Sequence, residues 1–376
     1  MKRRTFLKTP AALAAASLAL GGKAQPTPSE TPPTQSSEGT LRESGFRGEI
    51  EDMVPPDSPP STKDSCDPVA MANLGLHYLA NNPLPERDYQ TRFSLYLLNQ
   101  PILVPIVPPT KDLVDPVTLG DTESRMDTAY ILMREMTGST AGQAAQDGVR
   151  RRIMRYLRDD GLCWLNTEYA SSWTTGILLY SLAHQYRLTR DESVHNLGSK
   201  VLAGLKIMAT WDTGRAFYAR GAQAWSPEGT VPDYFPGHYP FVVEPVLTWY
   251  EATGDEEAFD FGLAMAEGMV RDLQPHQLHR SDGFVGGHSH LQMHAVSGVA
   301  HLGALTRDPR HIEWARKAYE LIRVRGVETG WVPEQNDLGF NKEYLYHTLH
   351  CETCLVCDMT LKPIVYQEIA IDGDCF

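Results

Sequence analysis

One pattern of apolar and polar residues recurs along the chain from Pro68 onward. Large apolar residues stand every three or four positions and lead to a threonine, at Thr137, Thr189, Thr253 and Thr306. Gly or Arg follows each threonine, and Ser or Asp comes next. The spacing is typical of an amphipathic helix, and the residues after the threonine are typical of a tight turn and the cap of a second helix. Each copy therefore predicts a helical hairpin.

The copies recur at intervals of roughly fifty to sixty residues, which fits a helical hairpin plus a long loop. A linear solenoid and a closed ring are both built from such units, and the long aromatic loops between the copies favour the ring. We therefore predict an all-α fold, an (α/α)6-type toroid of helical hairpins that is incomplete. The helix after Thr253 is expected to bury a stripe formed by Phe259, Leu263, Ala266, Met269 and Val270.

The first 24 residues have the pattern of an export signal. A basic start that contains Arg3 and Arg4 precedes an apolar run from Ala11 to Leu20, which is shorter than the ~20 residues that span a bilayer. The paired arginines predict a twin-arginine signal and a periplasmic or extracellular protein without a stable membrane span after cleavage. An ordinary secretory signal and an uncleaved anchor are the alternatives.

The remaining chain divides by composition. Residues 25–61 are rich in Pro, Ser, Thr and Glu, which predicts a disordered linker. Residues 62–362 are assigned to the toroid domain, and 363–376 to an irregular tail that follows Pro363. The net charge of −13 excludes a nucleic-acid partner, because it leaves no basic face for phosphates.

Two kinds of segment are candidates for function. Loops at 225–240 and 281–290 combine Gly and Pro with aromatic residues, which either stack on sugar rings or anchor the loops. The segment 330–359 gathers thiols, imidazoles and a carboxylate, which are zinc ligands in many proteins, although buried cysteines also serve as small core residues. Its candidate ligands are His347, His350, Cys351, Glu352, Cys354 and Cys357.

With the hairpin repeat and the Glu352-Thr353-Cys354 element, the chain resembles the six-hairpin glycosidase superfamily. Within it, the chain is most similar to bacterial β-L-arabinofuranosidases that use a cysteine nucleophile and zinc. The resemblance implies a glycoside hydrolase that acts on sugars derived from polysaccharide.

The resemblance also assigns residues to roles. It implies Glu334, Glu352 and Cys354 as catalytic residues, and Glu352, Cys354 and Cys351 as ligands of a zinc ion. It implies that the sugar contacts His288, His290, Trp331 and Tyr239. The family's second cysteine pair, well downstream, has no counterpart here, which predicts a truncated chain or a member without the nucleophile.

Other interpretations stay open for the same residues. A uronic-acid lyase or epimerase on this scaffold would use histidine, tyrosine or glutamate instead of a thiolate. A catalytically inactive or truncated carbohydrate-binding paralogue would need no catalytic residues. Glu334 also fits a surface loop carboxylate, and Asp127 fits a helix cap better than a catalytic group. His294 and His301 are expected to be packing residues.

The zinc interpretation predicts stoichiometric metal in the purified protein, measured by elemental analysis. Cys354→Ala is expected to abolish glycoside hydrolysis, because the thiolate would be the nucleophile. A lyase or epimerase would retain its activity in the same variant. A zinc-to-protein ratio near zero would remove the thiolate mechanism.

Overall fold

The structure is a computed structural model, and it describes residues 67–91, 121–165, 168–218, 225, 227, 240–271 and 289–324. All of these belong to one unit, Asp57–Phe376. The predicted signal peptide at 1–24, the predicted linker at 25–61 and the predicted tail at 363–376 lie outside the described residues. None of the described helices is long and apolar enough to cross a membrane.

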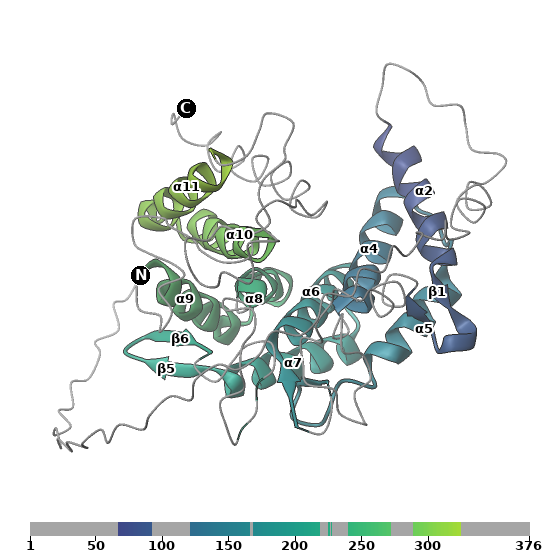
Figure 1. Ribbon diagram of the computed structural model, residues 1–376, viewed down its shortest axis with the longest axis horizontal. Helices are drawn as coiled ribbons and strands as arrows, with labels where there is room; N and C mark the ends of the chain where they lie inside the picture. The colour runs from purple at the N-terminus through teal and green to yellow at the C-terminus, as the bar shows by residue number, and fades with distance from the viewer. Residues whose placement is uncertain are drawn as a thin grey trace, which may run out of the picture. The chain divides into compact units, whose positions relative to one another are not determined.

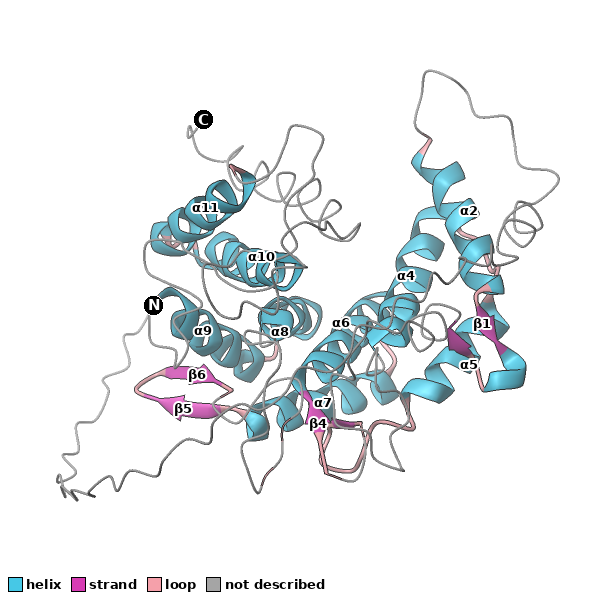
Figure 2. Cartoon of the chain, viewed as in Figure 1, coloured by secondary structure: helices cyan, strands magenta, loops and turns pink. Residues whose placement is uncertain are grey.

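The described residues are mainly helical. The α-helices are α2 (Pro68–Asn81), α4 (Asp121–Thr137), α5 (Gln143–Ile153), α6 (Ser172–Thr189), α7 (Glu192–Met208), α8 (Pro240–Thr253), α9 (Glu256–Val270), α10 (Ser289–Thr306) and α11 (Pro309–Arg323). Short strands pair antiparallel as β1 (Pro83–Leu84) with β2 (Gln90–Thr91), β3 (Cys163–Trp164) with β4 (Ala170–Ser171), and β5 (Thr210–Asp212) with β6 (Arg215–Phe217) (Figure 2). A 3-10 turn, η1 (Pro85–Arg87), joins β1 to β2.

The helices are arranged as hairpins. The pairs α4 with α5, α6 with α7, α8 with α9, and α10 with α11 pack against each other (Figure 1). The first helix of each pair also packs against the first helix of the next, so that α4, α6, α8 and α10 form a continuous row, called here the inner helices. The prediction of an all-α fold of toroid-type helical hairpins is therefore confirmed.

The threonine of the repeat ends each inner helix. At the end of α8, the Thr253 hydroxyl donates to the Trp249 carbonyl over 2.7 Å and accepts the Asp255 amide over 3.1 Å. Gly254 between them has φ of 77°, a left-handed conformation that glycine adopts without strain. Asp255 then caps α9 by accepting the Glu257 amide over 3.0 Å. One short phrase thus ends one helix, turns the chain and starts the next.

The same hydrogen bonds occur in the other copies. Thr137, Thr189 and Thr306 each donate to the carbonyl four residues before and accept the amide two residues after. The intervening residue has positive φ in every copy, including Arg190 at 53° and Arg307 at 55°. The predicted hairpin turns are confirmed at all four positions.

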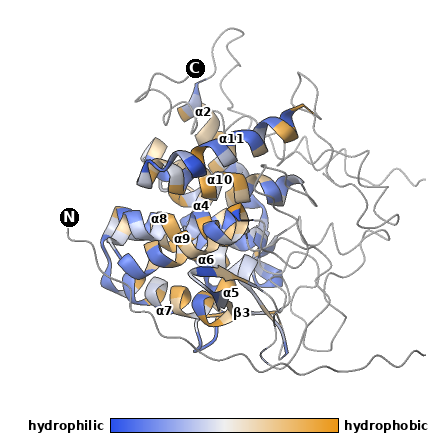
Figure 3. Ribbon diagram, turned by 90° about the vertical axis from the view of Figure 1, so that its left-hand side faces the viewer, coloured by the Kyte–Doolittle hydropathy of each residue, from blue (hydrophilic) through white to orange (hydrophobic). Residues whose placement is uncertain are grey.

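The second helices of the hairpins, α5, α7, α9 and α11, are called here the outer helices. The inner helix α8 and the outer helix α11 differ in how much of their surface is buried. In α8 the side chains of Phe241, Val242, Val243, Val246, Leu247 and Trp249 are all buried, and they cover most of the helix circumference. The outer helix α11 buries a single stripe, which includes Trp314, Ala318 and Ile322. Figure 3 shows apolar and polar positions side by side on individual helices such as α7. α8 has neighbours on more sides than α11, and its sequence is accordingly more apolar.

The stripe predicted for α9 is correct only in part. Met269 and Ala266 are buried, but Phe259, Leu263 and Val270 are partly buried. The face of α9 that is most deeply buried is centred instead on Phe261 and Met265. The strand β6 also packs against α9, and Trp211 of β5 lies on Phe261, so the hairpin β5–β6 shifts the buried face.

Two glycines allow the inner helices to approach closely. A Cβ atom on Gly176 of α6 would lie 2.6 Å from the Phe241 carbonyl oxygen of α8, and one on Gly298 of α10 would lie 2.8 Å from the Val243 Cβ. Any larger residue would push α8 away from its neighbours. These contacts hold Phe241 at the point where α6, α8 and α10 meet.

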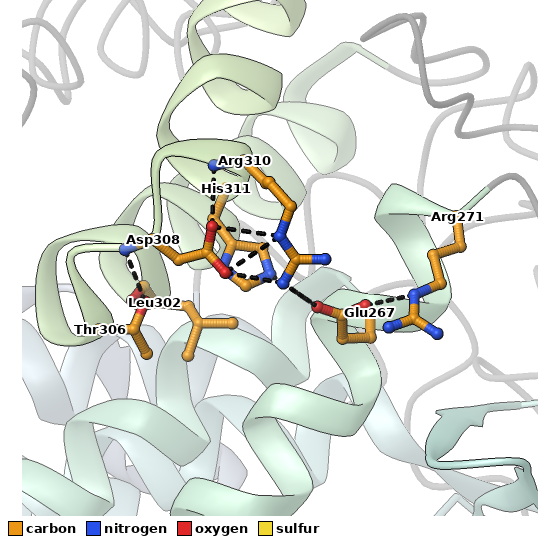
Figure 4. Close-up of polar contacts among 7 residues, drawn as sticks. All are labelled: Glu267, Arg271, Leu302, Thr306, Asp308, Arg310 and His311. Carbon is orange, nitrogen blue, oxygen red and sulfur yellow. Dashed lines mark hydrogen bonds and ion pairs between the residues drawn. The ribbon is translucent and has the colours of Figure 1, made fainter.

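A polar cluster joins the last two described hairpins (Figure 4). Glu267 of α9 is buried, and its Oε1 lies 3.1 Å from Nε2 of His311 and 3.3 Å from the Arg310 guanidinium. Arg271 makes a further ion pair with Glu267. Arg310 also pairs with Asp308, which caps α11 by accepting the Arg310 amide over 2.9 Å.

Asp308→Ala is expected to lower the free energy of unfolding by about 1 to 2 kcal/mol, because it removes a helix cap. The Arg310 contacts hold the pKa of Asp308 down at about 2. Its stabilising effect is therefore present at neutral pH and is lost as the pH falls through that value. Urea denaturation of the variant measures the loss, with the exposed Asp260→Ala on α9 as the control. An equal effect of both changes would contradict the assigned cap.

Candidate functional site

The amino-terminal ends of the inner helices lie together. The start of α6 is held by the hairpin β3–β4: Ser171 caps the helix by accepting the Thr174 amide over 3.2 Å. The Thr175 hydroxyl donates to the Ser171 carbonyl over 2.6 Å and accepts the Cys163 amide over 2.9 Å. A short sheet and a capped helix therefore fix the position of Trp173.

Phe241 is the centre of this region. It is 2% exposed, and its ring lies 5.3 Å from the ring of Trp173 on α6 and 4.1 Å from that of His294 on α10. His290 contacts the same ring edge-on at 5.8 Å, and the guanidinium carbon of Arg125 on α4 lies 4.8 Å above it. The other three inner helices, α4, α6 and α10, thus each contribute at least one side chain that contacts Phe241 of α8. We call the group formed by Asp121, Arg125, Trp173, Phe241, Glu244, His290 and His294 the inner-helix cluster.

Asp121 is the first residue of α4, and its side chain is 15% exposed. Its Oδ1 accepts from Nε of Arg125 over 2.6 Å. Burial raises the pKa of Asp121, and the neighbouring Arg125, His290 and Trp173 offset only part of this effect. The carboxyl group consequently keeps its proton to a higher pH than a surface aspartate, as a general acid requires.

A carboxylate also faces the histidines. Oε2 of Glu244 lies 3.6 Å from Nδ1 of His294, and the rings of His290 and His294 are 5.0 Å apart. Burial raises the pKa of Tyr180 on α6, and the charge of Glu244 adds to this shift. The cluster thus combines a carboxyl group, a carboxylate and two imidazoles.

The opposite ends of the inner helices carry a separate set of ion pairs. Arg187 of α6 pairs with Glu135 of α4 over 3.1 Å, and Nε2 of His301 on α10 lies 2.9 Å from Oε2 of Glu251 on α8. The hydrogen bond to His301 lowers the pKa of Glu251. These contacts link the same four helices at their carboxyl-terminal ends, and they show that neighbouring inner helices run in the same direction.

Of the residues assigned to the site from the sequence, His290 is the one that the structure describes. It is buried at the start of α10 and belongs to the inner-helix cluster. The other assigned residues lie outside the described residues, namely Glu334, Glu352, Cys354, Cys351, His288, Trp331 and Tyr239. Within the described ranges, no group of three or more potential ligands forms a metal site.

The structure changes the interpretation of two further residues. Asp127 is not a helix cap, since α4 begins at Asp121. Asp127 is buried and accepts hydrogen bonds from Gln146, Arg150 and Ser181, so it ties α4 to α5 and α6. His294, which the sequence suggested as a packing residue, does pack on Phe241 but also faces Glu244.

Sequence reasoning missed Asp121, Arg125, Trp173, Phe241 and Glu244 as members of one site. A signal was available, because each lies within five residues of the start of an inner helix. In a row of parallel helices, such positions share one end of the row. Counting back from the four threonines would have brought them together.

Comparison with solved structures supports the fold. The chain is similar to a D-mannose isomerase, with a TM-score of 0.51 and 10% identity over 67% of this chain and 70% of that one. It is also similar to a GH76 α-mannanase of Bacteroides thetaiotaomicron, with a TM-score of 0.52 and 12% identity over 68% and 71% of the two chains. No protein-family model matches the chain, and its sequence matches no curated protein. The chain therefore shares with these two proteins an all-α toroid fold of helical hairpins.

The raised pKa of Asp121 predicts a pH-dependent difference between the wild-type protein and Asp121→Asn. The folded protein keeps the Asp121 proton at a pH where the unfolded chain has lost it, so this residue's contribution to stability falls as the pH rises above about 4. Asparagine does not titrate. The free energy of unfolding of the wild-type protein minus that of the variant should therefore decrease from about pH 4 to about pH 7.

Urea denaturation at several pH values tests this expectation. The exposed Asp260→Asn is the matched control, and its difference from the wild-type protein should not decrease with rising pH. A constant difference for Asp121→Asn would show that Asp121 ionises as an ordinary surface carboxylate does.

Proposed function

We propose that this protein is a carbohydrate-processing enzyme whose sugar site is the inner-helix cluster. The observation that carries the proposal is the convergence of a guanidinium, an indole and two imidazoles on Phe241 of α8 from the three inner helices α4, α6 and α10. The partly exposed Trp173 provides an aromatic face for a sugar ring, and Phe241 supports it from below. The similarity of the fold to a mannanase and a mannose isomerase is consistent with this class of substrate.

The reaction that we favour is hydrolysis of a glycosidic bond. Such a reaction needs a protonated acid that donates to the leaving oxygen, and burial keeps Asp121 protonated to a higher pH than usual. Glu244 is a carboxylate in the same cluster that is suited to the opposite role, as base or stabiliser of positive charge. Glycosidases commonly combine two carboxyl groups, one as the acid and the other as base or nucleophile.

A second reaction is favoured by the two histidines. His290 and His294 lie one helical turn apart with their rings in contact, and Glu244 faces His294. Two imidazoles at this spacing can remove a proton from a carbon next to a carbonyl and return it elsewhere, which is the chemistry of sugar isomerisation or epimerisation. Isomerisation or epimerisation would also act on a carbohydrate, but the substrate would have to be a free reducing sugar.

The more specific proposal is a β-L-arabinofuranosidase-like hydrolase that is exported through the twin-arginine route. It depends on Glu334, Cys354 and a zinc ion, and these residues lie outside the described ranges. The hydrolase and the isomerase interpretations make opposite predictions for residues that the structure does describe.

If the protein is a hydrolase, Asp121→Asn should lower kcat/KM for glycosides by about 10²- to 10⁴-fold, the usual contribution of a general acid. The loss should be smaller for a p-nitrophenyl glycoside than for an alkyl glycoside, since p-nitrophenolate leaves without protonation. Release of p-nitrophenol and of new reducing ends gives the two rates. His77→Ala on α2 is an exposed control.

If the protein is an isomerase, His294→Ala should abolish interconversion of free hexoses, measured by chromatography of the products. Glycosides should then remain intact with the wild-type protein. Absence of both activities, together with no binding of any sugar, would refute the proposed function.

A further inference from the structure

Arg125 is the cation of the inner-helix cluster, and two contacts fix its orientation. Its Nε donates to Oδ1 of Asp121 over 2.6 Å, one helical turn earlier on α4. Its guanidinium carbon lies 4.8 Å from the centre of the Phe241 ring on α8. A planar guanidinium held by its Nε and by one face has its terminal nitrogens in a defined position.

One of these terminal nitrogens has no role within the described structure. Nη2 of Arg125 is buried, and it donates to none of the described residues. Burying a charged donor without an acceptor is unfavourable, so such a group in a binding site points to a partner that arrives with the ligand. The Arg125 side chain as a whole is 35% exposed, so part of it is open to a ligand, while Nη2 itself is covered.

The chemistry of the guanidinium limits what that partner is. Its parallel N–H groups match the two oxygens of a carboxylate better than a single hydroxyl does. The nearest acid, Asp121, engages Nε and leaves Nη2 without an acceptor. The partly exposed indole of Trp173 lies on the same Phe241 ring, so a sugar ring and its substituent would meet adjacent surfaces.

We infer that Arg125 binds the carboxylate of an acidic sugar, so that the substrate class is a hexuronic acid or a glycoside that contains one. This inference rests on the proposed function and narrows it from carbohydrates in general to anionic ones. Burial raises the pKa of Asp121, and a less ionised Asp121 leaves more of the Arg125 charge for the ligand.

Binding of matched sugars to the full-length protein tests the inference. D-Glucuronate is compared with D-glucose, and D-galacturonate with D-galactose, by isothermal titration calorimetry at constant ionic strength. Each acidic sugar should bind about tenfold to a hundredfold more tightly than its neutral counterpart, the usual effect of a hydrogen bond to a charged group. Acetate, which has the carboxylate without the ring, should bind much more weakly.

Variants identify the residue responsible. Arg125→Gln should remove the preference for the acidic sugar, and Arg125→Lys should retain part of it, because the lysine keeps the charge but not the fork. Arg316→Gln on the outer helix α11, where Arg316 pairs with Glu313, should leave the preference unchanged. Circular dichroism of each variant confirms that it is folded.

Three results would overturn the inference while leaving the proposed function intact. They are equal binding of acidic and neutral sugars, a preference that survives Arg125→Gln, and acetate binding as tight as uronate binding, which would mean an adventitious ion only. Failure of every sugar to bind and react would refute the proposed function itself. If Arg125→Gln does not fold, Arg125→Lys decides the case, because a preference as large as that of the wild-type protein would overturn the role of the guanidinium.

Discussion

The architecture depends on the hydrogen bonds of one threonine at the end of each inner helix. The hydroxyl accepts the amide two residues later while it donates to the last turn of the helix, as Thr253 does between Trp249 and Asp255. The turn is short, so the next helix must return along the first. Four such turns orient the inner helices alike. Their amino-terminal ends therefore come together, and longer connections precede them.

The amino-terminal ends of the inner helices meet, and this explains why the inner-helix cluster contains both aromatic and charged side chains. Phe241 is nearly inaccessible, and the close approach of α6 at Gly176 leaves its position no freedom. Polar and aromatic side chains from the other three inner helices surround its ring. Acid–base groups are thereby held on a rigid support, which is the preorganisation that the proposed sugar site requires.

Charged groups inside the hairpins have a different role from those of the cluster. Asp127 accepts from Gln146, Arg150 and Ser181, and Glu123 pairs with Arg152. Glu267 is surrounded by Arg310, His311 and Arg271. Each buried carboxylate is compensated by cations or donors from a neighbouring helix, as expected for structural contacts. Arg125 differs because one of its donors remains for a ligand.

The sequence by itself determined the hairpins. Local hydrogen bonds from Thr, Gly and Asp end one helix and cap the next, and such interactions are encoded within about six residues. The repeat therefore identified all four turns and the all-α class. It did not identify the buried face of α9, where the hairpin β5–β6 shifts the deepest contacts to Phe261 and Met265.

Only the tertiary structure decided which residues share a site. Asp121, Trp173, Phe241 and His294 are separated by long stretches of chain, and their equivalent positions near the starts of the inner helices bring them together only because those helices pack side by side. Their proximity follows from the packing of parallel inner helices, which approach closely at glycines. The same packing buries Asp121 and thereby raises its pKa. Burial and distance between remote residues are properties of the packed molecule, so the raised pKa of one carboxyl and the remaining donor of Arg125 appear only there.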